Sequence, residues 1–91
     1  MFRCLLGYLL RPWLCAKMRR QEAAAEAAYA AMYDARPHAV KDLYDDARAH
    51  FSRAIDLAQR ADLVADAAHL TARRDEVTQV YARQFRGVGY D

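Results

Sequence analysis

Two amphipathic segments between His38 and Phe85 organise the chain: HAVKDLYDDARAHFSRAIDLAQR (38–60) and, after Ala61, DLVADAAHLTARRDEVTQVYARQF (62–85). In the first half, apolar residues recur at alternating spacings of four and three, which places them on one face of an α-helix. These residues are Val40, Tyr44, Ala47, Phe51, Ala54 and Ala58, with Leu43, Ile55 and Leu57 beside them. The pattern predicts an amphipathic helix over residues 38–60.

The second half predicts another helix, over residues 62–86. Its apolar residues are Leu63, Ala67, Leu70, Val77, Tyr81 and Phe85. Arg74 interrupts this series, and we expect its long side chain to lie over the edge of the core. Asp62 is a candidate N-cap, because its carboxylate can accept a backbone N–H of the first turn. Gly87 suits the left-handed position that often follows the end of a helix.

The apolar phase shifts by five residues between Ala58 and Leu63, and this shift predicts that the two helices form an antiparallel hairpin. No Gly or Pro marks a turn there, so an unbroken helix that pairs with a second copy remains the alternative. Its seam would consist of alanines: Ala54, Ala58, Ala61, Ala65, Ala68 and Ala72. Such a helix would measure about 70 Å, so the length of the molecule separates the two folds.

Part of the first helix has a familiar pattern. The spacing of Ala47, Phe51 and Ala54, followed by Ile55 and Leu57, resembles the second helix of a tetratricopeptide repeat. The resemblance covers about a dozen residues; the preceding helix lacks the Trp-Leu-Gly-Tyr pattern of that family, and no second repeat follows. It implies a helical hairpin of that general kind and assigns no binding residue.

A further helix is predicted near residues 20–35, within the segment RRQEAAAEAAYAAMYDAR (19–36). Alanine gives this segment high helix propensity, and its bulky apolar residues are Tyr29, Met32 and Tyr33. Pro37 disfavours helical geometry at Arg36 and suits the first turn of the next helix. The expected fold is therefore all-α: about three helices with a C-terminal antiparallel helical hairpin, in a single helical domain over residues 19–91.

Residues 1–18, MFRCLLGYLLRPWLCAKM, form an apolar N-terminal segment that Arg11 and Pro12 interrupt. Its apolar run is shorter than the roughly 20 residues that span a bilayer. Three interpretations stay open: docking on the domain, insertion into a membrane interface, and binding to a partner. The expected partner or membrane contacts are Leu5, Leu6, Tyr8, Leu9, Leu10, Trp13, Lys17, Arg19 and Arg20.

The two cysteines, Cys4 and Cys15, are expected to be reduced. In a helix their Cα atoms would lie about 16 Å apart, whereas a disulfide requires a separation below about 7 Å. Only a bend at Pro12 would bring them together. Reduced thiols predict a cytoplasmic protein, located at the inner face of the membrane if the N-terminal segment is interfacial.

Catalytic motifs are missing from the sequence. Ser52 is the only serine and lies inside a helical pattern, and the three glycines form no phosphate-binding loop. We therefore expect no enzyme, no cofactor and no small-molecule substrate. Asp46 with His50 and Asp66 with His69 would face each other in a hairpin, which leaves a helical metal-binding protein as an alternative. The Glu-x-x-His motif of di-metal bundles is absent, however, so we assign no metal ligand.

Charge and size point to association. The net charge of +2, with both signs interspersed along the helices, is too small to indicate nucleic-acid binding. A chain of 91 residues rich in alanine builds a small core, and oligomerisation is a common remedy. We expect a non-enzymatic interaction or scaffolding protein that acts as a homo-oligomer or as an accessory subunit of a larger assembly. The alternative is a peripheral membrane-associated adaptor anchored by residues 1–18.

Overall fold

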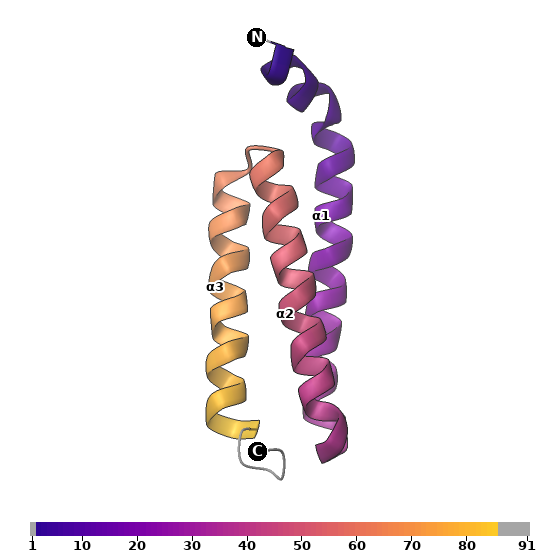
Figure 1. The fold of residues 1–91 in the computed structure, drawn as a ribbon, viewed down its shortest axis with the longest axis vertical. Coiled ribbons are helices and arrows are strands. Elements are labelled where there is room, and N and C mark those ends of the chain that lie inside the picture. The colour runs from indigo at the N-terminus through magenta and orange to yellow at the C-terminus, as the bar shows by residue number, and fades with distance from the viewer. Residues whose placement is uncertain (1, 86–91) are drawn as a thin grey trace.

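The computed structural model describes the backbone of residues 2–85 and the side chains of residues 10–85. Within this range the chain forms three α-helices, α1 (Phe2–Asp34), α2 (Pro37–Arg60) and α3 (Val64–Val80), and no strand. A π-helical turn, η1 (Tyr81–Phe85), continues α3. The prediction of an all-α domain is confirmed. Helices α2 and α3 lie side by side and run in opposite directions, as a hairpin requires (Figure 1).

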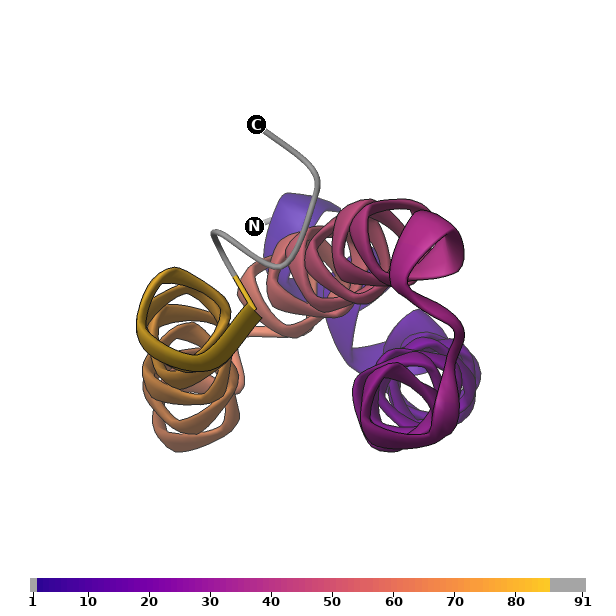
Figure 2. The same ribbon diagram turned by 90° about the horizontal axis from the view of Figure 1, so that it is seen from below.

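Helix α2 is the central element and lies between α1 and α3 (Figure 2). Its predicted apolar stripe is buried throughout, from Val40 to Ala58, and Phe51 has no exposed surface. Burial of a side chain of that size stabilises a fold by about 1.5–3 kcal/mol. The flanking helices complete the same core with Leu14, Met18, Ala25 and Met32 from α1 and with Leu70 and Val77 from α3.

The turn between α2 and α3 is a Schellman motif. Asp62 has a φ of 61°, in the left-handed region. Leu63 donates its backbone N–H to the carbonyl of Ala58 at 2.8 Å, and Asp62 donates to Gln59 at 3.1 Å, which is the pair of bonds that defines the motif. Asp is one of the few residues besides Gly that visit this region, so the helix ends without a glycine.

The prediction that Asp62 caps the second helix is wrong. Leu63 is the N-cap residue of α3, without a side-chain cap hydrogen bond. Asp62 instead completes the end of α2, because its left-handed backbone lets the two closing bonds form. The unbroken-helix alternative is also excluded: the longest dimension of the molecule is 53 Å, below the roughly 70 Å that such a helix requires.

Helix α1 is longer than predicted, since it begins at Phe2 and not near residue 20. Pro12 lies inside this helix, where its ring crowds the preceding turn and removes one backbone hydrogen bond. The first turns of α1 tilt away from the rest of the helix and extend past the α2–α3 turn (Figure 1). Leu14 and Met18 are buried in the core, so tertiary packing holds the helix together after the proline.

The seam between α1 and α2 follows a heptad-like spacing. The inward positions of α1 are Leu14, Met18, Gln21, Ala25, Ala28 and Met32, again at alternating intervals of four and three. Gln21 is the polar member, and a hydrogen bond of 2.7 Å joins its Oε1 to Nδ1 of His50. A single polar pair in an apolar seam fixes the register of two helices.

The end of α3 is held by aromatic contacts. The ring of Tyr81 stacks on that of Tyr44 with centroids 3.9 Å apart, and Phe85 meets Tyr33 edge to face at 5.3 Å. Arg74 is half-buried, and its Nη1 donates to Ser52 Oγ at 3.0 Å. The cap predicted at Gly87 lies outside the described residues.

Candidate functional site

Exposed apolar side chains gather at the end of the bundle where α1 extends past the hairpin turn. Leu10 is 41% exposed, Trp13 is 56% exposed, and Val64, at the start of α3, is 75% exposed. A shallow hollow of about 410 Å³ lies at the same end, lined by Arg11, Pro12, Cys15 and Leu63. Large apolar side chains that cluster in water mark candidate interaction sites.

Four exposed residues of α1 share one helical face. Leu10, Trp13, Lys17 and Arg20 follow each other at spacings of three, four and three, and all four are exposed. We call this set the α1 stripe. Within it, Nζ of Lys17 lies 4.5 Å from the centre of the Trp13 ring, in a cation–π contact. The stripe therefore combines apolar surface with positive charge in one place.

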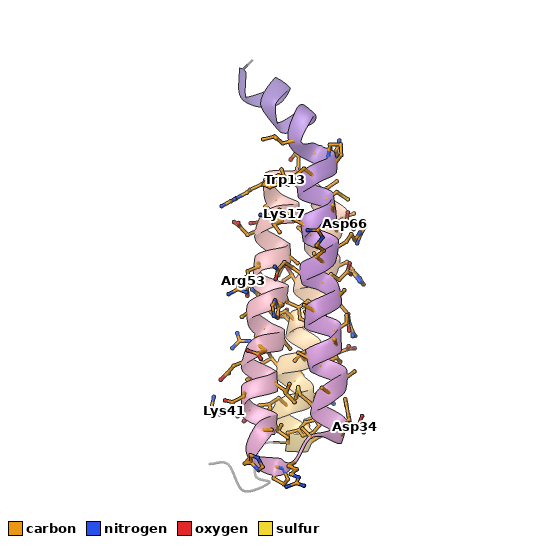
Figure 3. All side chains as sticks on the ribbon, turned by 90° about the vertical axis from the view of Figure 1, so that its right-hand side faces the viewer. Trp13, Lys17, Asp34, Lys41, Arg53 and Asp66 are labelled. Carbon is orange, nitrogen blue, oxygen red and sulfur yellow. The ribbon has the colours of Figure 1, made fainter. Side chains whose placement is uncertain are left out.

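A groove of about 430 Å³ lies beside the stripe, between α1 and α2. Its lining residues are Lys17, Gln21, Ser52, Arg53, Asp56 and Leu57. Figure 3 shows Trp13 and Lys17 on α1 above Arg53 on α2. Asp56 is engaged by Arg60, whose Nε is 3.1 Å from its Oδ2. The cations Lys17 and Arg53 thus border the groove from two different helices.

The cations of the bundle differ in whether they are paired. Lys41 and Arg60 pair within α2, whereas Arg11, Arg36, Arg48, Arg74 and Arg83 form no ion pair with a described residue. The cations between α1 and α3 are paired: Arg19 with Glu22 at 2.9 Å and Asp66 at 3.2 Å, and Arg73 with Glu26 at 2.6 Å and with Glu76. Lys17, Arg20 and Arg53, which we call the basic face, form no ion pair with another described residue. The positive charge of the basic face is therefore directed to solvent.

The paired cations hold α1 against α3. Nε and Nη2 of Arg73 donate to the two carboxylate oxygens of Glu26 at 2.8 and 2.6 Å, a bidentate arrangement that raises the pKa of Arg73. The same guanidinium lies 5.4 Å from the centre of the Tyr29 ring. Burial raises the pKa of Tyr29 to about 12, and a hydrogen bond with Tyr33 adds to this shift. We interpret this network as structural.

The structure brings part of the predicted contact set together. Leu10, Trp13, Lys17 and Arg20 form the α1 stripe, whereas Arg19 points to Asp66 on α3 and belongs to the α1–α3 contact. The other four predicted contacts, Leu5, Leu6, Tyr8 and Leu9, lie outside the residues whose side chains are described. Arg53 was not predicted, since only the fold places it across the groove from Lys17.

The histidines and aspartates considered for metal binding do not converge. His50 on α2 contacts Gln21 on α1, and Asp66 on α3 contacts Arg19 on α1. Among the described residues no three His, Cys, Asp or Glu side chains lie close enough to hold a metal ion. Cys15 is a half-buried free thiol, while the side chain of Cys4 lies outside the described range.

None of the described helices is both long and apolar enough to cross a membrane. Comparison of the chain with protein-family models, curated proteins and solved structures gives no match. The α1 stripe and its groove are thus interpreted from the residues of this chain.

Proposed function

We propose that this protein is a non-enzymatic helical interaction protein that attaches through the N-terminal half of α1, with the α2–α3 hairpin as its folded body. The main support for the proposal is the exposure of Trp13. Its side chain is 56% exposed and lies on the same helical face as Leu10 and Lys17. Removal of such apolar surface from water contributes about 25 cal/mol per Å² to association. Tryptophan and arginine are also the residues that dominate binding at many interfaces.

The first candidate occupant of this surface is protein: a second copy of the chain or a larger assembly of which it is an accessory subunit. The small size of the chain and its alanine-rich seams support this form of the proposal, because additional apolar burial would come from a partner. The second candidate is a membrane surface. It is favoured by the charge of residues 1–21, which contain five Lys and Arg side chains and no Asp or Glu.

Sedimentation velocity at increasing protein concentration, combined with tryptophan fluorescence, tests the proposal. Trp13 is the only tryptophan, so its emission reports directly on the proposed surface. Self-association through the stripe predicts a rise in mass together with a blue shift of the emission. The Leu10→Ser/Trp13→Ser variant should lose the rise in mass, whereas Tyr33→Ser, which changes an exposed aromatic residue on the α3-facing side of α1, should keep it.

A rise in mass that both variants retain would contradict attachment through α1. A wild-type chain that stays monomeric would reject self-association. If its Trp13 emission also remained unchanged with lipid vesicles, attachment to a second copy and attachment to a membrane would both fail.

A further inference from the structure

We propose that the α1 stripe and the basic face dock on an anionic lipid bilayer, with Trp13 at the level of the headgroups and Lys17, Arg20 and Arg53 on lipid phosphates. This inference rests on the proposed attachment function and names the occupant of the surface. It adds a residue of α2 to the contact, so the membrane would bind to the folded bundle as well as to its N-terminal segment.

Charge complementarity selects an anionic partner. The cations between α1 and α3 are neutralised by Glu22, Glu26, Asp66 and Glu76, whereas the basic face has no carboxylate within ion-pair distance among the described residues. The one carboxylate that lines the groove, Asp56, is paired with Arg60. A Lys or Arg near an anionic bilayer contributes about 1 kcal/mol to binding.

The axial spacing of Trp13 and Lys17 fits the thickness of the headgroup layer. Trp13 and Lys17 are one helical turn apart, about 6 Å along the axis, and Arg20 follows after about another 4.5 Å. The polar layer on each side of a bilayer is about 5–7 Å thick. Tryptophan prefers this layer because its ring is amphipathic. Since Lys17 stacks on Trp13, its ammonium group would lie among the lipid phosphates.

The exposed leucine favours a bilayer over other polyanions. Leu10 is 41% exposed on the same face as the cations. A bilayer offers apolar chains directly below its phosphates, so Leu10 and Trp13 would be buried while the basic side chains remain in the polar layer. A nucleic-acid backbone offers phosphates without such an apolar layer, and it would leave Leu10 in water.

Co-sedimentation of the full chain with vesicles tests the proposal. We expect binding to vesicles of equal parts phosphatidylcholine and phosphatidylserine and much weaker binding to pure phosphatidylcholine. Lys17→Gln and Arg53→Gln should each weaken binding about fivefold, the equivalent of about 1 kcal/mol. Trp13→Ser should also weaken it. Lys41→Gln/Arg83→Gln removes two exposed charges elsewhere, with Lys41 near the opposite end of the bundle (Figure 3), and should bind like the wild type.

The Arg53 variant is the decisive member of this series, because Arg53 lies on α2, outside the N-terminal segment. Unchanged binding of Arg53→Gln would reject docking of the basic face. Equal binding to the two kinds of vesicle, or an equal loss in the Lys41/Arg83 control, would overturn the lipid proposal. Tighter binding to a DNA oligonucleotide than to the mixed vesicles at the same salt would also overturn it.

The lipid proposal and the attachment function fail in distinguishable ways. Self-association with a blue shift of the Trp13 emission, together with no binding to vesicles, would reject a lipid bilayer as the occupant. It would leave the α1 stripe as an attachment surface for protein. A monomer whose Trp13 emission responds neither to concentration nor to vesicles would reject the lipid proposal together with self-association. Circular dichroism melts of each variant verify that changes in binding do not arise from unfolding.

Discussion

The backbone N–H of Leu63 donates to the carbonyl oxygen of Ala58 at 2.8 Å, and this bond closes the turn that converts α2 into α3. It forms only because Asp62, between them, adopts a φ of 61°. A left-handed conformation costs a residue with a Cβ atom about 1–2 kcal/mol, whereas glycine adopts it readily. The fold of the hairpin therefore depends on one strained backbone position.

Asp62→Gly should stabilise the protein by about 1 kcal/mol, because the left-handed turn would lose its steric cost. In a domain of this size that change raises the melting temperature by about 4–8 °C. Asp62→Val should lower it, since a β-branched residue tolerates this region poorly. Thermal unfolding followed by circular dichroism measures both variants, and equal melting temperatures for the two would contradict the assignment of the turn.

The hairpin could be predicted from the apolar phase, but the chemistry of its turn could not. The stripe from Val40 to Ala58 and the change of phase before Leu63 are periodic signals, and the structure buries the same side chains. Asp62 carries no comparable signal, because aspartate is favoured at N-caps and its type therefore predicts the start of the next helix. Only the two closing hydrogen bonds show that it ends α2.

The extent of α1 was missed for a different reason. The seam of Leu14, Met18, Gln21 and Ala25 crosses the change in composition at residue 18, so two segments considered separately each show only half of it. Pro12 also suggested a boundary, although the structure places it inside the helix. The four residues of the α1 stripe are among the nine contacts predicted from the sequence. Arg53 could not be found in this way, because its position beside Lys17 depends on the packing of α1 against α2.

Met18→Ala should lower the free energy of unfolding by about 2–5 kcal/mol, because the side chain of Met18 has no exposed surface and its removal leaves a cavity. Trp13→Ser, only five residues earlier on the exposed face, should change it by no more than about 0.5 kcal/mol. Urea denaturation of both variants provides the comparison. A similar loss of unfolding free energy in Met18→Ala and Trp13→Ser would show that Trp13 is part of the core and not of a surface for partners.

The contact between Arg73 and Glu26 should show a coupling free energy of about 1 kcal/mol in a double-mutant cycle with alanine. Two parallel hydrogen bonds on half-buried side chains make this pair stronger than an ordinary surface pair. The exposed pair Lys41–Asp45, at 3.4 Å, is the matched control and should give no more than about 0.5 kcal/mol. If the coupling free energy of Arg73–Glu26 were as small as that of Lys41–Asp45, the pair would not contribute to the contact between α1 and α3.

Tyr29 should ionise well above the usual range of a tyrosine. Burial raises the pKa of Tyr29 to about 12, from about 10 in the unfolded chain. Because the folded state holds this proton more tightly, the resulting stability is fully present below pH 10 and is lost as the pH rises through 12. Titration of the phenolate absorbance should show a late step that disappears in Tyr29→Phe. Persistence of that step in the variant would contradict the assignment.

In the proposed complex, Trp13 lies on the attachment surface and meets the headgroup layer of an anionic bilayer. Its fluorescence with vesicles that contain phosphatidylserine and lipids brominated on their acyl chains reports the depth of the ring in the bilayer, because bromine quenches only nearby indole rings. We expect a blue shift of the emission and strong quenching when the bromine is close to the headgroup, with weaker quenching when it is near the chain end. Emission that remains unshifted and unquenched while the protein co-sediments with these vesicles would contradict this placement of Trp13.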